Sequence, residues 1–274
     1  MKSYSNIISL NLNSRGVYCI DTSMGCESGM KNEPGGCYGD CYAAKSAKLY
    51  GYDFSKTVLR GFDGYWHEIE ILKKINHSKA KFIRIGCSGD PSENWQHCIN
   101  ILDKLKTCNK EIVIITRHWT ILSDQQIAWL SRLNICINSS VSALDTPEIM
   151  YRSISQFKRL EKHLKSVLRI VSCDFNTKNE TGLNLHQIQN ELFKNEPVID
   201  TIFRPSLKNK LVIDGIVNVS KTLFNGKKTL TSKFNKRTFA GKCKNCSELC
   251  GVGVKSNYKH TTRPGLETQN QFWN

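Results

Sequence analysis

The chain has 274 residues, with 39 Lys or Arg against 24 Asp or Glu and a formal charge of +15 at pH 7, and this length suits one large α/β domain or two ordinary ones. No run of eighteen apolar residues occurs, and Asn and Ser interrupt the apolar stretch near the N-terminus, which disfavours a membrane span and a signal peptide. We therefore expect a soluble, cytoplasmic protein without a membrane partner.

Short apolar runs typical of β-strands alternate with segments of helical spacing along the chain. Most of these runs are apolar at nearly every position, as strands covered on both faces tend to be. The predicted strands cover residues 16–20, 81–85, 111–116, 135–141, 167–172 and 198–204.

Helices are expected between these strands, because apolar residues recur at helical spacing over residues 62–75 and 99–105. Ser123 before QQIAWL marks one helix start, and DTPE at 145–148, with Pro147 in the first turn, marks another. Strands that alternate with helices predict an α/β protein with a parallel sheet and right-handed crossovers. A barrel, a partial barrel and an open doubly wound sheet all fit this pattern.

Small, polar or basic residues follow nearly every predicted strand. Ligands bind at the carboxyl ends of the strands both in barrels and in open parallel sheets. We therefore expect the functional site among the segments GCSGDP (86–91), TRHW (116–119), NSSVS (138–142), SCDFN (172–176) and RPS (204–206).

Two compact groups stand out among the twelve cysteines. Thiols in a reducing compartment stay reduced unless they are catalytic or ligated, so clustered cysteines indicate a metal site. The first group is Cys26-x10-Cys37-x3-Cys41, and the second is Cys243-x2-Cys246-x3-Cys250.

The first group stands on a loop with five glycines. An iron–sulfur cluster favours such a loop, because the backbone must wrap the cluster closely and offer amide hydrogens to its sulfides. Zinc is the main alternative, although structural zinc takes four ligands and neither group has four cysteines; unligated thiols are the third. Cys19, Cys87 or Cys173, near strand ends, can supply a fourth ligand to the second group, but each is otherwise expected to be unligated.

A basic segment runs from Leu207 to Lys242, with nine Lys or Arg, one acidic residue (Asp214) and three phenylalanines. Basic residues with interleaved aromatic residues suit a nucleic-acid backbone and stacked bases. The alternative is a solvated, lysine-rich surface. Nucleic acid is thus a candidate partner of this segment.

Several motifs together resemble a known superfamily. The first cysteine group, with an aromatic residue beside Cys41, is similar to the cluster loop of radical S-adenosylmethionine (radical SAM) enzymes, although its spacing is ten and three instead of three and two. GCSGDP resembles the element that meets the amino group of SAM, with Asp in place of Glu, and NSSVSALD resembles the loop that contacts its ribose and carboxylate. More narrowly, CYGDCYAAK, RIGCSGDP, IITRHW and CKNCSELCG resemble phage-encoded, cysteine-rich gene product 88-type proteins.

The resemblance implies a partial (β/α)6 TIM-like barrel with parallel strands over residues 1–206 and a basic, cysteine-containing extension over 207–274. It implies that Cys26, Cys37 and Cys41 ligate three irons of a 4Fe–4S cluster, and that SAM chelates the fourth. An electron from the reduced cluster would then release a deoxyadenosyl radical. The second cysteine group resembles an auxiliary cluster site, so one or two clusters are expected.

The resemblance also implies which residues surround SAM or the substrate. Asp90 would accept from the SAM amine, although it equally suits a turn or helix N-cap before PSENW. His118 is expected to be structural rather than a catalytic base. The implied SAM or substrate contacts are Gly89, Asp90, Ser140, Ser142, Arg117 and Arg204.

The function we predict is reductive cleavage of SAM to modify an anionic substrate such as nucleic acid, with an electron donor as a further partner. The alternative is a non-catalytic iron–sulfur or zinc protein of phage or mobile-element origin that binds nucleic acid.

Overall fold

The computed structural model describes residues 2–13, 15–33, 35–224, 226–235, 238–242, 245–246 and 249–253. Cys243 of the second cysteine group lies outside the described residues, as do Lys236 and Arg237 of the basic segment. Across the ranges that are described, no helix combines the length and the apolar character needed to cross a membrane.

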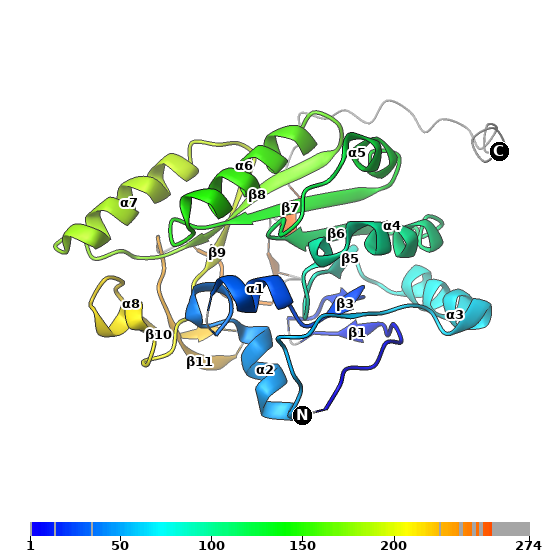
Figure 1. Cartoon of the computed structure of the whole chain (residues 1–274), viewed down its shortest axis with the longest axis horizontal. Coiled ribbons are helices and arrows are strands. Elements are labelled where there is room, and N and C mark those ends of the chain that lie inside the picture. Colours follow the sequence, from blue (N-terminus) through cyan, green and yellow to red (C-terminus); the bar gives the residue numbers. More distant parts are fainter. Residues whose placement is uncertain are drawn as a thin grey trace.

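A seven-stranded, mostly parallel sheet forms the centre of the protein (Figure 1). Its order is β1-β2-β5-β6-β7-β8-β9, and β1 is antiparallel to β2. All six predicted strands are present, with ends within two residues of the prediction. The strands are β1 (Asn11–Leu12), β2 (Tyr18–Cys19), β5 (Phe82–Ile85), β6 (Glu111–Thr116), β7 (Ile135–Val141), β8 (Lys165–Ser172) and β9 (Val198–Ile202).

The α/β class is therefore confirmed. From β2 onward the strand order follows the chain without reversal, whereas a doubly wound sheet reverses its order at a switch point. The doubly wound alternative is wrong. The sheet is not closed, since β1 and β9 stand at its two ends.

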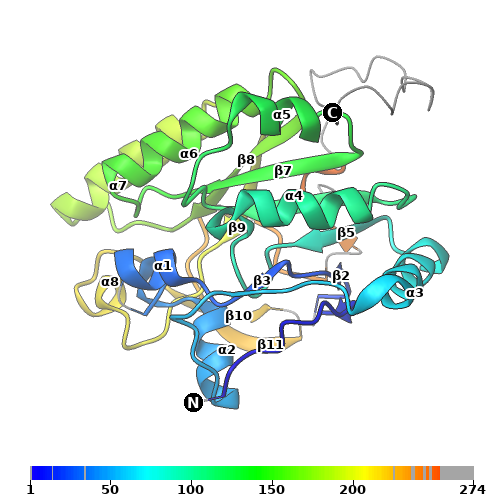
Figure 2. The same ribbon diagram turned by 45° about the vertical axis from the view of Figure 1, so that its right-hand side comes forward.

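Helices cover one face of this sheet, as Figure 2 shows for α4 to α7. Isoleucines at alternate positions of β5, β6 and β7, such as Ile83, Ile114 and Ile137, pack against the helices in one buried cluster. Alternate residues of a strand face opposite sides, so this pattern leaves the other positions facing away from the helices. The helices are α3 (Gly64–His77), α4 (Trp95–Lys104), α5 (Asp124–Leu130), α6 (Pro147–Leu160) and α7 (Glu180–Leu192).

The predicted helix starts are largely correct. Ser123 forms a capping box with Gln126 at the start of α5. At α6 the cap is Thr146, within the predicted segment DTPE, and Pro147 occupies the first turn as expected.

The face of the sheet away from the helices carries polar side chains between small apolar ones. Arg84 pairs in register with Val113, Ser140 pairs with Arg169, and these positions alternate with the helix-facing isoleucines. Charged residues inside a sheet are costly unless they meet a partner or a ligand. The charged residues on this face therefore indicate that it meets a partner or a ligand.

The cysteine loop comes between β3 (Ser23–Met24) and β4 (Val58–Leu59), which pair with each other. It contains helix α1 (Glu27–Asn32), the 3₁₀ turn η1 (Cys37–Gly39) and helix α2 (Tyr42–Tyr50). The 3₁₀ turn η2 (Pro91–Glu93) follows β5.

The chain after β9 returns to the polar face of the sheet. It forms helix α8 (Lys210–Ile213), the antiparallel hairpin of β10 (Ser220–Phe224) and β11 (Lys227–Thr231), and the 3₁₀ turn η4 (Leu249–Gly251). Cys250 belongs to the buried cluster on this face, and its carbonyl accepts a 3.0 Å hydrogen bond from Asn138 Nδ2. We call residues 249–253 the C-terminal segment.

Replacing Asn138 with Ala should release the C-terminal segment from the sheet. The change removes a buried hydrogen bond, so we expect the free energy of unfolding to fall by about 1–3 kcal/mol. Limited proteolysis should cleave the chain beyond Gly241 faster than in the wild type. Asn195→Ala is the matched control, because the Asn195 side-chain amide donates to the Leu192 carbonyl in its own turn. Equal cleavage of the two variants would contradict this anchoring role.

Candidate functional site

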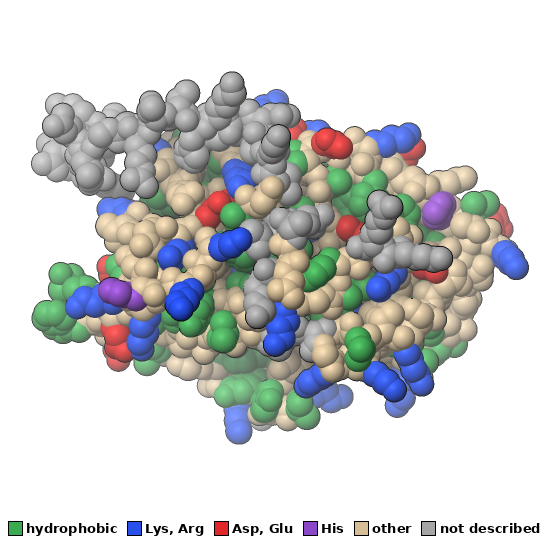
Figure 3. All heavy atoms as spheres, turned by 180° about the vertical axis from the view of Figure 1, so that it is seen from behind, with side chains coloured by type: hydrophobic (Ala, Val, Ile, Leu, Met, Phe, Trp, Pro, Cys, Tyr) green, Lys and Arg blue, Asp and Glu red, His purple; other side chains and the backbone are tan. Residues whose placement is uncertain are grey.

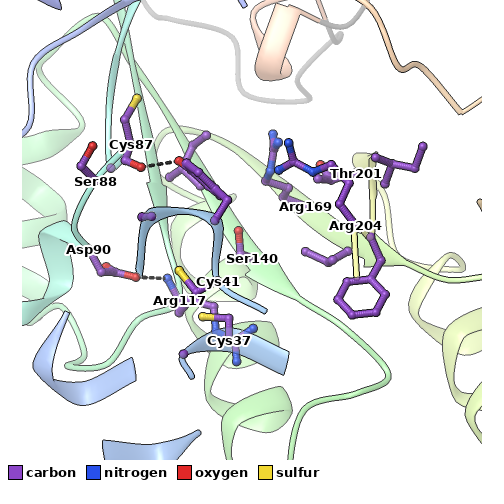
Figure 4. Close-up of a pocket in the computed structure, with 18 of the residues that line it drawn as sticks. Cys37, Cys41, Cys87, Ser88, Asp90, Arg117, Ser140, Arg169, Thr201 and Arg204 are labelled. Atoms are coloured by element: carbon purple, nitrogen blue, oxygen red, sulfur yellow. Dashed lines mark hydrogen bonds between the residues drawn. The ribbon is translucent and has the colours of Figure 1, made fainter. Parts of the chain in front are cut away.

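A cavity of about 730 Å³ opens at the carboxyl end of the parallel strands. Its wall comes from the cysteine loop, the ends of β5 to β9, the β10–β11 hairpin and the C-terminal segment. Figure 4 shows Cys37 and Cys41 between Asp90 on one side and Arg169 with Arg204 on the other.

Most of the predicted site residues line this cavity. Ser142 does not: its hydroxyl donates to the Val171 carbonyl at 2.7 Å, and its amide donates to Asp145 at 2.8 Å. Cys243 lies outside the described residues. The predicted residues that do line the cavity are Cys26, Cys37, Cys41, Gly89, Asp90, Arg117, Ser140, Arg204, Cys246 and Cys250.

The first cysteine group forms one packed cluster at what we call the cysteine end of the cavity. Cys26 is buried, Cys37 and Cys41 are half-buried, and all three belong to a hydrophobic cluster with Phe54 and Trp119. Burial raises the pKa of Cys37 to about 12. A metal that binds here must therefore displace protons from the thiols.

Glycines let the loop fold back onto its own thiols. A Cβ on Gly29 would lie 2.7 Å from Cys26 Sγ, and a Cβ on Gly36 would lie 2.6 Å from Cys41 Cβ. Both distances are shorter than real Cβ contacts, so a side chain at either position would force the neighbouring cysteine to move. The thiols and the close backbone around them fit the requirements of an iron–sulfur cluster.

Within the described ranges, no three His, Cys, Asp or Glu side chains converge to hold one metal ion. A 4Fe–4S cluster makes a different demand, because each of its thiolates bonds a separate iron atom.

Helix α1 takes up the long gap between Cys26 and Cys37. Glu33 directly follows this helix, and its carboxylate pairs with Arg117 at 3.1 Å. Arg117 also pairs with Asp145 at 2.7 Å, hydrogen-bonds Tyr38 and stacks on that ring at 4.9 Å. Two carboxylates thus neutralise Arg117, and its role is to hold the loop against the end of β6.

Asp90 caps η2, as its position before PSENW suggested, and it also binds the next loop. Oδ1 accepts from the Ser92 amide at 2.9 Å and from the Thr116 hydroxyl at 2.7 Å. Oδ2 accepts from the Arg117 amide at 2.7 Å. A carboxylate oxygen has two lone pairs, so Oδ2 can accept one further hydrogen bond from a ligand amine.

His118 is fully buried and does not line the cavity. Its Nε2 lies 2.8 Å from Ser139 Oγ. Burial, with the nearby positive charges of Arg152 and Arg159, lowers the pKa of His118 to about 3. A neutral histidine in this position supports the loop, in line with the structural role expected from the sequence.

Cys250 of the second cysteine group lies on the polar face of the sheet beside Cys19 of β2 and Cys87 of the loop after β5. Cys246 and Cys250 line the cavity, and Cys250 packs in the same cluster as Cys19 and Cys87. Cys87 Sγ lies 2.6 Å from Cys19 Sγ and 3.0 Å from Arg84 Nε. Cys173, the other suggested partner, is buried in a different cluster.

Three arginines of the cavity wall were missed by the sequence reasoning: Arg15, Arg84 and Arg169. Two of them interrupt apolar strands, in FIRI of β5 and VLRIVS of β8. A charge within such a run was the signal, because strand alternation then directs it away from the packed helices. With Arg204 they form what we call the arginine cluster.

The basic segment contributes to the cavity through part of its length. Lys227, Lys242 and Phe224 line the cavity, whereas the exposed Lys221 and Lys228 do not. Figure 3 shows that Lys and Arg side chains are spread over the face opposite to that of Figure 1. The high net charge is therefore only partly a feature of the site.

Comparison with protein-family models, with curated proteins and with solved structures gave no match for this chain.

Replacing Gly36 with Ala should disrupt the cysteine end of the cavity. The new methyl group would collide with Cys41, and φ of 77° with ψ of −170° adds backbone strain, so we expect a loss of about 3 kcal/mol or more. Bound metal should fall with it. Gly51→Ala is the control, since Gly51 also has φ of 77° but open space around it, and should cost about 1 kcal/mol. If thermal unfolding and metal analysis give the same results for the two variants, the close packing of Gly36 against Cys41 is refuted.

Proposed function

We propose that this protein is an iron–sulfur enzyme of the radical SAM type, which reductively cleaves SAM in the 730 Å³ cavity to modify an anionic substrate. One observation carries the proposal. The cysteine group, the loop with Gly89 and Asp90, and Ser140 come from distant parts of the chain, yet all line one cavity at the carboxyl ends of parallel strands.

A partial (β/α)6 barrel is the architecture we propose for the core. Six parallel strands in chain order support it, because right-handed crossovers between successive neighbours place every helix on one face. The opposite face then becomes an interior. The polar residues Arg84, Ser140 and Arg169 on that face, around a cavity, support this reading.

Cys26, Cys37 and Cys41 are the residues we propose as ligands of a 4Fe–4S cluster. When bound, a reduced cluster supplies the electron that cleaves SAM. The protein's own part is positioning, because Phe54 and Trp119 pack around the thiols.

The loop after β5 is proposed to receive the SAM amino group. Asp90 Oδ2 has one lone pair left for an amine donor, and its position is fixed by the Arg117 amide. Gly89 lets the segment before Cys26 lie directly against this loop, since a Cβ there would lie 2.4 Å from the Ser23 carbonyl oxygen. Ser140 at the end of β7 faces the same cavity and can bond the ribose or carboxylate.

A second candidate is a non-catalytic iron–sulfur or zinc protein that binds nucleic acid. The hydrogen bonds that Asp90 accepts within the protein favour this candidate. They already use most of the acceptor capacity of the carboxylate in the absence of a ligand. The exposed Lys221 and Lys228 of the hairpin would then contact phosphates.

Anaerobically purified protein should contain iron and sulfide, about four of each per cluster. With a strong reductant it should convert SAM to methionine and deoxyadenosine. Cys37→Ala and Cys41→Ala should abolish this cleavage and the cluster of the cysteine end, because each removes a ligand. Cys108→Ala is the control, since this half-buried thiol lies outside the cavity, and it should keep both iron and activity.

The possible outcomes separate the two candidates. Iron and sulfide without SAM cleavage would favour the binding protein. Stoichiometric zinc in colourless protein would contradict the cluster, and unchanged iron in both cysteine variants would refute the ligand assignment.

A further inference from the structure

The four arginines of the arginine cluster line the same cavity as the first cysteine group. In Figure 4, Arg169 and Arg204 stand next to each other, on the side away from Asp90. Among the described residues the arginines that form ion pairs are Arg117 and Arg159. The cluster therefore concentrates positive charge without paired carboxylates.

The members of the arginine cluster contact mainly sulfur atoms and aromatic rings. Arg84 reaches Cys87 at 3.0 Å, and Arg169 bonds the Cys250 thiol. Arg204 stacks on Phe224 at 4.4 Å and on Tyr42 at 5.4 Å. These contacts orient the guanidiniums, but the rings do not neutralise them.

Arg15 stacks on the same ring of Phe224, at 5.2 Å, and donates to the Gly241 carbonyl at 3.1 Å. Its Nε is buried and has no hydrogen-bond partner among the described residues. One phenylalanine therefore holds Arg15 and Arg204 together, with donor capacity to spare.

The nearest acids are already committed to other groups. Asp21, close to Arg84, accepts hydrogen bonds from three successive amides of the loop after β5. Asp200, close to Arg169, accepts from two hydroxyls. Neither carboxylate reaches a guanidinium of the cluster as an ion pair.

Part of the cluster carries its charge at a cost. Burial lowers the pKa of Arg204, and the charges of Arg15, Arg169 and Arg84 act in the same direction, although the Tyr42 hydroxyl opposes them. Gathering desolvated cations without counter-charge is unfavourable, and a bound anion reverses this cost. The arrangement is therefore preorganised for an anion.

We propose that the arginine cluster binds the phosphate group of a phosphate-ester substrate. A dianionic phosphate balances two guanidiniums, whereas one carboxylate balances one, and the planar fork of arginine matches phosphate oxygens. Lys227 and Lys242 line the same cavity and add positive charge. The inference rests on the proposed function only in treating this cavity as the substrate site.

Inorganic phosphate is the probe, titrated against the full-length protein by calorimetry and by thermal unfolding, with chloride at equal ionic strength as reference. We expect saturable binding and a raised unfolding temperature in phosphate only. The Arg169→Gln/Arg204→Gln variant should bind phosphate at least about tenfold more weakly, since each loses a charge-assisted hydrogen bond. Arg132→Gln, an exposed arginine away from the cavity, should behave as the wild type.

A second readout separates ligand binding from a structural role. In phosphate-free buffer, Arg204→Gln should unfold at or above the wild-type temperature, because burial and the neighbouring arginines oppose the charge of Arg204; a clear decrease would overturn the proposal. Equal effects of phosphate and chloride on the wild type would overturn it as well, whether or not the variants fold. Iron is counted in the same samples, so retained phosphate binding without iron points to failure of the cluster proposal alone.

Discussion

The cysteine loop and the loop after β5 meet backbone to backbone at Gly25 and Gly89, which form a parallel bridge. The Gly25 amide donates to the Ser88 carbonyl at 3.0 Å, and a Cβ on either glycine would collide with a carbonyl oxygen. Cys26 follows Gly25, and Asp90 follows Gly89. This contact therefore fixes the first thiol relative to the carboxylate, and the rest of the site is arranged around that pair.

The sheet supplies the second constraint through the difference between its two faces. Isoleucines on the helix side give the sheet its stability, which allows the other side to carry Arg84 and Arg169 at a cost. Asn138 holds the C-terminal segment over this polar face. The cavity that results is lined by both the first cysteine group and the arginine cluster, which suits the redox cofactor and the anionic substrate that we propose.

The sequence predicted the sheet well because buried parallel strands are short, apolar and separated by helices. The hydrophobic pattern within a short stretch of sequence shows this alternation. The cavity was predicted in part, since Cys26 and Asp90 follow strands and Ser140 lies at the carboxyl end of β7. Ser142 was misplaced because it lies only two residues beyond Ser140, where the chain has left the strand and turns to bond Asp145. The arginine cluster was missed because it is formed by residues distant in sequence, whose proximity depends on strand register.

Electron paramagnetic resonance of the anaerobically reduced protein, with and without SAM, tests most directly whether a cluster at Cys26, Cys37 and Cys41 has an iron open to SAM. We expect a reduced-cluster signal in the wild type that shifts when SAM is added, and loss of the SAM-sensitive signal in Cys41→Ala. A cluster signal that is identical with and without SAM would contradict SAM binding at this site, and the absence of any cluster signal in iron-replete protein would contradict the cluster itself.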